Sequence, residues 1–278
     1  MHIDLHLHSA ASDGLLQPAG LVQAVRAAGI HVFSITDHDT VDGLADGRLA
    51  AQACGLTLIA GIELSAYWGK VELHILGYFI DPNHAELTGF LHRIRGARQV
   101  RMHAMLNRLQ AMGLGVPPAS VFERAHHGNV GRPHLARALV ERGFVSTTDE
   151  AFDRYLGTGR PAFVPRPDVS VADAIRMIRT AGGLASLAHP GLYGRDDAIP
   201  DLVAAGMQAI EVYHPQHTFG RIAHYKRVAK RYALLVTGGS DFHGTAEGEH
   251  AATPGYPFLP ESDYLLLEAA QSAGRPGD

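Results

Sequence analysis

Short apolar runs alternate with helical patterns along most of this 278-residue chain, and no other feature limits the possible folds so strongly. Buried strands are predicted at seven places, over residues 1–7, 32–36, 56–64, 72–78, 184–188, 207–212 and 233–236. Helices are predicted among them, over residues 18–28, 44–54, 85–112, 171–181 and 221–231. Strands that alternate with helices are typical of parallel βα units, so the sequence predicts an α/β protein.

The middle of the chain departs from this alternation. Residues 86–163 show helical patterns and no buried strand, and the long helix predicted there is rich in arginine. We therefore expect a barrel of residues 1–85 and 164–278, interrupted by a helical insertion, or cap, of residues 86–163. A distorted or incomplete βα barrel fits this order best, and an open doubly wound sheet is the alternative.

The composition excludes fibrous, disordered and membrane-spanning chains. Hydrophobic residues make up 46% and charged residues 19%, and no apolar stretch approaches the roughly 20 residues that cross a bilayer. A net charge of −4 argues against a nonspecific nucleic-acid-binding surface, so double-stranded DNA is not an expected partner. The single cysteine and the lack of a leader pattern predict a cytoplasmic protein, and no obligate protein partner is evident.

Histidine is the unusual component, with 18 residues against 24 lysines and arginines together. Many of these histidines, with several carboxylates, lie where predicted strands end: His6-Leu7-His8 with Asp13 beyond it, Asp37-His38-Asp39, Ile62-Glu63, His74, Ala188-His189-Pro190 and Asp241-Phe242-His243. Side chains two residues apart on a strand share a face, and the carboxyl ends of barrel strands meet at one rim. Nitrogen and oxygen donors without a thiolate suit divalent ions such as Mn²⁺, Fe²⁺ or Zn²⁺ rather than a structural zinc site.

Five of these motifs, in this order over residues 4 to about 260, resemble the polymerase and histidinol phosphatase (PHP) domain family: Asp4-Leu5-His6-Leu7-His8-Ser9, Thr36-Asp37-His38-Asp39, Gly61-Ile62-Glu63, Ala188-His189-Pro190 and Ser240-Asp241-Phe242-His243. Within that family they resemble the stand-alone nucleoside 3',5'-bisphosphate phosphatases and 5'-to-3' exoribonucleases. The resemblance implies a distorted (β/α)7 barrel with three divalent ions, often manganese.

The matching positions imply three metal sites: one formed by His6, His8 and Asp241, a second by His74 and His189, with Glu63 bridging these two, and a third by Asp13, His38 and His243. Three divalent ions bring six positive charges and the three carboxylates remove three, so a phosphate ester is attracted to the rim. A hydroxide bridging two metals is the expected nucleophile. The predicted catalytic residues are His6, His8, Glu63, Asp241, His243 and Asp37, with Asp37 either orienting a ligand histidine or acting as an acid–base group.

The cap is expected to choose the substrate. Arg98 and Arg101 are three residues apart on one helix face, and Arg132 opens another helix with Pro133 and His134. The resemblance implies that these arginines hold the phosphate that is not cleaved, because guanidinium groups bind phosphate oxygens in pairs. The predicted substrate-binding residues are Arg98, Arg101, Arg132, Pro133, His134 and Tyr193. Other histidines are expected at the surface or beside the ligands: His126, His127, His217, His224 and His250.

These residues predict a metal-dependent phosphoesterase that acts on nucleotides carrying a 3'-phosphate or on short RNA. Two alternatives stay open. One is a phosphatase of the histidinol-phosphate type, although its substrate offers only one phosphate to an arginine-rich cap. The other is a non-catalytic PHP binding module, which the complete set of nine donors disfavours.

Overall fold

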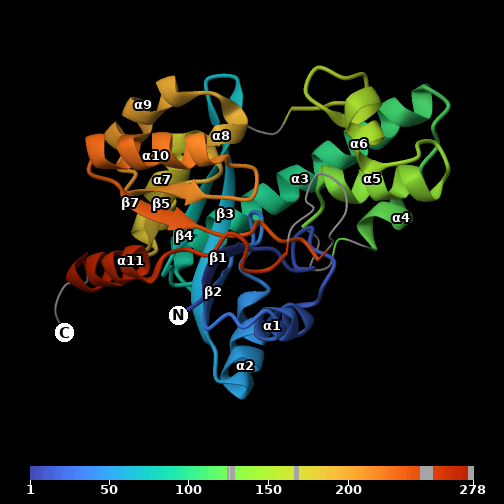
Figure 1. Ribbon diagram of the computed structural model, residues 1–278. Coiled ribbons are helices and arrows are strands. Elements are labelled where there is room, and N and C mark those ends of the chain that lie inside the picture. The colour runs from blue at the N-terminus through green and yellow to red at the C-terminus, as the bar shows by residue number, and fades with distance from the viewer. Residues whose placement is uncertain (124, 126–128, 166–168, 245–252, 275–278) are drawn as a thin grey trace.

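Seven strands form a single sheet in which each strand lies beside its neighbours in the sequence. The computed structural model describes the whole chain except residues 124, 126–128, 166–168, 245–252 and 275–278 (Figure 1). The strands are β1 (Ile3–Leu7), β2 (Val32–Ile35), β3 (Thr57–Trp68), β4 (Val71–Tyr78), β5 (Leu184–Leu187), β6 (Ala209–Tyr213) and β7 (Leu235–Gly238). The seven predicted strands are therefore confirmed.

The two ends of the sheet approach each other and nearly close a barrel. Leu7, at the end of β1, forms a parallel bridge with Phe242, which follows β7. Backbone hydrogen bonds flank this bridge, because the His8 amide donates to the Phe242 carbonyl and the Asp241 amide donates to the His6 carbonyl, both at 2.9 Å. The predicted α/β barrel is confirmed, and the open doubly wound sheet is wrong.

Strand β4 is antiparallel to its neighbours. The sequence predicted parallel units and no antiparallel strand. Strand β4 pairs antiparallel with both β3 and β5, whereas every other neighbouring pair in the sheet is parallel. The cause is the short turn at Gly69 between β3 and β4, since a parallel return needs a crossover of a dozen residues or more. Gly69 has a φ of 58°, which glycine adopts without strain. Strand β3 also continues to Trp68, beyond its predicted end.

Five helices lie where the periodicity predicts them: α1 (Pro18–Ala27), α2 (Leu44–Cys54), α3 (Ala85–Ala111), α7 (Val171–Thr180) and α10 (Phe219–Arg231). The other helices and helical turns are α4 (Pro118–Phe122), α5 (Arg132–Glu141), α6 (Thr148–Ala151), the π-helical η2 (Phe152–Leu156), α8 (Pro190–Tyr193), the 3-10 turn η3 (Asp196–Ala198), α9 (Ile199–Ala204) and α11 (Glu261–Gly274). Among the described residues, no helix combines the length and hydrophobicity that crossing a bilayer requires.

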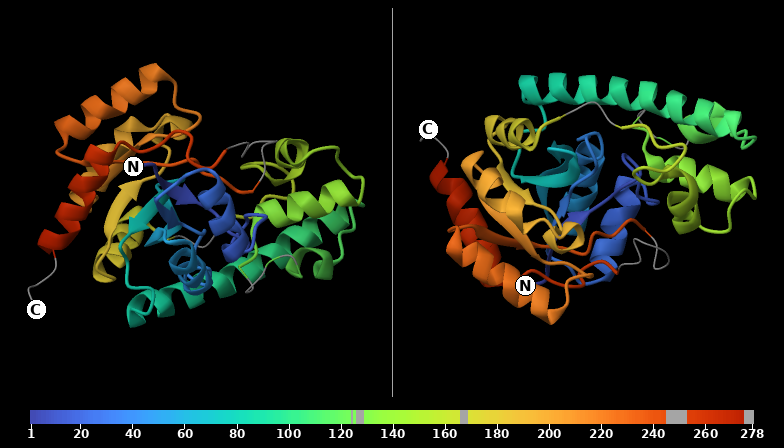
Figure 2. Two further views of the ribbon diagram at one scale, coloured as in Figure 1. Left: turned by 60° about the horizontal axis from the view of Figure 1, so that its bottom comes forward. Right: turned by 90° about the horizontal axis from the view of Figure 1, so that it is seen from above.

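Helix α3 connects the barrel to the cap. Figure 2 shows it crossing the outside of the barrel and continuing beside α4 and α5. Leu87 and Phe90, in its first half, pack into the main apolar cluster of the barrel, whereas Met105 and Leu109 pack into a second cluster with α4, α5, α6 and η2. The boundary expected at residue 86 thus falls in a helix whose first half packs on the barrel and whose second half packs in the cap.

Candidate metal centre

All nine predicted metal ligands lie at one rim of the barrel. They come from β1 and the loop after it, the loop after β2, the middle of β3 and β4, and the segments that follow β5 and β7. Alternation along β1 and on to His8, the residue after it, gives Asp4, His6 and His8 one face and the apolar Ile3 and Leu5 the other. All of these β1 side chains are buried, so the strand register fixes where the imidazoles lie.

The first group of donors contains His6, His8, Glu63 and Asp241. His6 Nε2 lies 3.1 Å from His8 Nε2, 3.3 Å from Glu63 Oε2 and 3.2 Å from Asp241 Oδ1. His8 Nε2 lies 3.2 Å from each of the same two carboxylate oxygens. These four side chains are the ones that the resemblance assigns to the first metal site together with its bridging glutamate.

The second group forms around the other side of Glu63. Its Oε1 lies 2.9 Å from His74 Nδ1 and 3.1 Å from His189 Nε2, and its Oε2 lies 3.1 Å from His38 Nδ1. His38, Glu63 and His74 have donor atoms that are all mutually close, whereas His189 joins through its contact with Glu63. The structure therefore brings His38 into this group, which the predicted assignment did not include.

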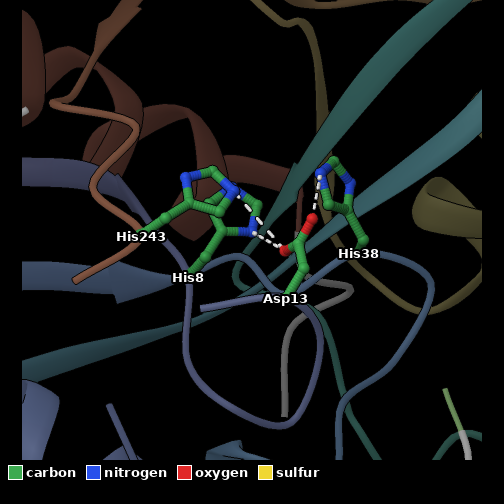
Figure 3. Close-up of side chains that lie close together, drawn as sticks. All are labelled: His8, Asp13, His38 and His243. Carbon is green, nitrogen blue, oxygen red and sulfur yellow. Dashed lines mark ion pairs between the residues drawn. The ribbon is translucent and has the colours of Figure 1, made fainter. Parts of the chain in front are cut away.

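The third group is shown in Figure 3 and contains His8, Asp13, His38 and His243. Asp13 points between the rings, with Oδ1 3.4 Å from His243 Nε2 and 3.8 Å from His8 Nδ1. Asp13 Oδ2 lies 3.8 Å from His38 Nε2. His8 and His38 thus each present one ring nitrogen to this group and the other to a neighbouring group, so the three groups form one continuous cluster.

Burial and mutual attraction set the charges in this cluster. Burial alone would raise the pKa of the Glu63 carboxyl, but the surrounding imidazoles of His38, His74 and His6 hold that pKa well below its usual range. Burial would lower the pKa of His8, but its contacts with Asp241 and Glu63 raise it to about 10. Burial lowers the pKa of His38 to about 3, although Glu63 and Asp13 oppose the change. Glu63 is therefore ionised at neutral pH.

The donor set fits divalent cations. It offers imidazole nitrogens and carboxylate oxygens, the ligands preferred by Mn²⁺, Fe²⁺ and Zn²⁺. Nδ1 of His8, the ring nitrogen that faces the third group, is buried without a hydrogen-bond partner, which is costly for a polar atom unless something else binds there. The carboxylates of Asp13, Glu63 and Asp241 are concentrated in this cluster, and bound divalent cations would balance their negative charge.

Two residues beside the cluster were missed at the sequence level. Glu211, on β6, accepts hydrogen bonds from His6 Nδ1–H and from the His189 amide. His214, just after β6, has Nε2 3.4 Å from Asp241 Oδ2, while its Nδ1 accepts from the Gln216 amide. Sequence features could have identified both residues. Glu211 is a lone acid inside an apolar run, and His214 precedes a proline after a strand, as His189 does.

Asp37 is buried beside the cluster and accepts hydrogen bonds from the loop after β1. Its two oxygens accept from the Ser9 amide at 2.7 Å, the Ser9 hydroxyl at 2.6 Å and the Ser12 hydroxyl at 2.7 Å. The carboxylate is buried, and burial raises its pKa. Asp37 therefore holds the loop that carries Asp13, and its role in orienting a ligand histidine or exchanging protons with substrate stays a prediction.

A cavity of about 590 Å³ opens above the cluster and extends under the cap. The candidate ligands Asp13, His38 and His74 line one side, and the cap lines the other with the predicted residues Arg98, Arg132, Pro133 and His134, together with Asn129, Gly131, Asp149, Phe152 and Asp153. Arg101 and Tyr193 are not among the lining residues. Arg101 donates to the Val164 carbonyl inside the cap, and the Tyr193 hydroxyl accepts from the His74 amide.

Polar contacts tie the cap to the ligand-bearing loops. Arg98 forms a buried ion pair with Asp39, next to His38, and Asn129 donates to the His38 carbonyl. Arg137, on α5, donates to the Asp13 carbonyl at 2.7 Å. Of the remaining histidines, His217 is buried and accepts from the Gly191 amide, and His224 is half-buried and contacts Asp196. His126, His127 and His250 lie outside the described residues.

Comparison with known proteins agrees with this geometry. Residues 4–111 match the PHP domain, and the chain is 37% identical over 257 residues to the 3',5'-nucleoside bisphosphate phosphatase of Chromobacterium violaceum, covering 89% of each protein. The chain belongs to the PHP family. This PHP protein is also 37% identical over 246 residues to a 5'-3' exoribonuclease of Haemophilus influenzae, covering 86% of this chain and 89% of the relative.

A solved structure has the same fold throughout. It is described as an amidohydrolase from Chromobacterium violaceum with bound sulfate and no metal. The TM-score is 0.88 at 35% sequence identity, and the match covers 97% of this chain and 96% of the other. The likeness therefore includes the cap as well as the barrel of this PHP protein.

Proposed function

We propose that this PHP protein is a metal-dependent phosphoesterase that removes the 3'-phosphate from nucleoside 3',5'-bisphosphates, trims short 5'-phosphorylated RNA, or does both. The main support for this proposal is a cavity lined by two kinds of group that can bind phosphate. On one side lie nitrogen and oxygen donors for divalent cations, and on the other lie the guanidinium groups of Arg98 and Arg132. A substrate with two phosphates matches such a cavity, and relatives named for such substrates support the choice.

The nine rim residues would hold three divalent ions, with manganese as the first candidate. The groups would be His6, His8, Glu63 and Asp241; Glu63, His74 and His189; and Asp13, His38 and His243. Bound divalent ions supply Lewis acidity and lower the pKa of water from 15.7 towards about 7. The chain's own contribution is to fix these donors on strand ends, buried and in register.

Arg132 is the better placed of the two arginines to hold the uncleaved phosphate. Its guanidinium lies 3.3 Å from the Glu72 carboxylate and 5.7 Å from the ring centres of Phe152 and Phe163, at the cavity wall. Arg98 is committed to the buried carboxylate of Asp39 and to the Val130 carbonyl. A phosphate bound by Arg132 would compete with Glu72, whose carboxylate is the partner of Arg132 at the cavity wall.

His134 supplies a neutral hydrogen-bond donor to the same cavity. Its Nδ1 accepts from the Gly131 amide at 3.1 Å, so the proton of the neutral ring lies on Nε2. Burial lowers the pKa of His134 to about 4, and the ring therefore stays neutral at pH 7. In this state it orients a phosphate or ribose oxygen without exchanging a proton.

The deciding experiment compares phosphate or nucleotide release by the Mn²⁺-loaded protein from adenosine 3',5'-bisphosphate, AMP, histidinol phosphate and a 5'-phosphorylated RNA trimer. We expect the bisphosphate or the trimer to exceed AMP clearly. Equal rates on AMP and histidinol phosphate would favour the histidinol-phosphate type instead. A protein that binds no divalent ion and hydrolyses none of the four would be a binding module. The proposal includes a cytoplasmic location, which cell fractionation tests.

A further inference from the structure

Glu211 connects two predicted metal ligands that belong to different strands. Its side chain, fully buried on β6, has Oε1 3.0 Å from His6 Nδ1. Its Oε2 accepts a hydrogen bond from the His189 backbone amide at 2.6 Å. His6 belongs to the first donor group, and His189 contacts Glu63 in the second. One carboxylate thus supports both groups from outside the set of nine donors.

The contact with His6 decides which ring nitrogen carries the proton. His6 Nε2 is the atom that faces His8, Glu63 and Asp241, so a cation there requires a free electron pair on Nε2. A neutral imidazole has one protonated nitrogen, and Nδ1 must then be the donor. Glu211 is an acceptor at Nδ1 and therefore stabilises the tautomer that can bind metal.

The contact with His189 fixes an unfavourable backbone. His189 has a φ of 27° and a ψ of 56°, a region that residues other than glycine rarely occupy. Its amide points at Glu211 Oε2, and this bond helps to hold the bend that turns the ring towards Glu63. Both partners of Glu211 are donors in the metal-binding state, so only a group with two acceptors satisfies them together.

We propose that Glu211 is a positioning residue that fixes the metal-binding tautomer of His6 and the backbone of His189. The inference rests on the proposed metal centre. Asp4, a second buried acid near His6 outside the nine donors, differs from Glu211 because its oxygens accept from the backbone amides of His6, Ser240 and Gly255 rather than from the His6 ring.

The variant Glu211→Gln tests this role at nearly constant volume. A glutamine side chain has one acceptor oxygen and one NH₂ group. Its NH₂ group must therefore face one of two donors, either His6 Nδ1–H or the His189 amide. Partners that orient a metal ligand typically contribute 10–100-fold to metal affinity, and we expect a loss of about that size in Mn²⁺ affinity by calorimetry. Thr237→Val is the matched control. Thr237 lies on β7, paired with Glu211 of β6, and is equally buried, but its hydroxyl bonds to Ser186. The Thr237→Val variant should therefore bind Mn²⁺ like the wild type.

A second measurement separates the tautomer from the lost charge and needs no variant. Nitrogen-15 chemical shifts of the histidine rings in the Zn²⁺-loaded wild type should show His6 protonated at Nδ1. A proton on His6 Nε2 would overturn the proposal. This result does not depend on whether the glutamine variant folds. Wild-type Mn²⁺ affinity in Glu211→Gln would overturn it while leaving the metal centre intact. A wild type that binds neither Mn²⁺ nor Zn²⁺ would overturn both proposals.

Discussion

The barrel and the cap position their functional groups by different means. In the barrel, candidate ligands lie on or directly after strands, and backbone register fixes them among buried neighbours. In the cap, a separate apolar cluster holds the helices, and side-chain contacts such as Arg98 with Asp39 and Arg132 with Glu72 connect it to the rim. The candidate metal ligands are therefore fixed by the fold of the backbone, whereas the cap is joined to the rim by side-chain ion pairs.

The largest effect is expected from Glu63→Ala, which removes the carboxylate that contacts five imidazoles. Those imidazoles belong to His6, His8, His38, His74 and His189. Metal affinity should fall by more than the roughly 100-fold that an orienting partner contributes, and hydrolysis with it. Metal content by mass spectrometry and phosphate release measure this. Ile62→Val, beside Glu63 in the barrel core, should lower stability by about 0.5–1.5 kcal/mol and leave metal content unchanged.

The next effect concerns the contact between cap and barrel. Arg98→Ala leaves the buried Asp39 carboxylate without its guanidinium, which should cost about 3–5 kcal/mol of unfolding free energy in urea titrations. Arg95→Ala on the same helix is the control, because its pair with Asp42 is partly exposed and should contribute about 1 kcal/mol or less. Equal losses in the two variants would contradict a special role for the buried pair.

Substrate choice should change with Arg132→Ala. A hydrogen bond to a charged group contributes roughly 1.5–3 kcal/mol, so KM for a bisphosphate should rise about 10–100-fold. KM for AMP should change much less, since AMP lacks the second phosphate. Arg101→Ala, inside the cap and away from the cavity lining, should affect both substrates alike. An equal rise for both substrates in Arg132→Ala would remove this residue from phosphate recognition.

The smallest effect is a difference in hydrogen exchange when Mn²⁺ is added. Amides of the rim segments at His8, His38 and Asp241 should become more protected, because the bound cation stabilises the folded rim. Amides in α5 should change less, since the described contacts between α5 and the rim are side-chain bonds such as that from Arg137 to the Asp13 carbonyl. Protection spread evenly over barrel and cap would show that the two regions respond as one unit.

The sequence predicted the barrel better than it predicted the cap contacts. Apolar periodicity is local, so the seven strands and five of the helices could be found from it. It did not predict α11, whose Tyr264 and Leu267 become apolar anchors only when they meet β1 and β4 residues such as Ile3 and Leu76. The antiparallel direction of β4 depended on the short turn at Gly69 rather than on any periodicity.

What the sequence by itself determined is the set of rim residues, because histidines and carboxylates at the ends of successive barrel strands must meet at one end. The tertiary structure alone decided which partners those side chains have. It placed Asp37 against two serines, paired Arg101 with the Val164 carbonyl and buried His217, where burial lowers its pKa to about 4. It also set Glu211 behind His6 and His189. Such contacts join residues far apart in the chain, and only the packed fold brings them within hydrogen-bonding distance.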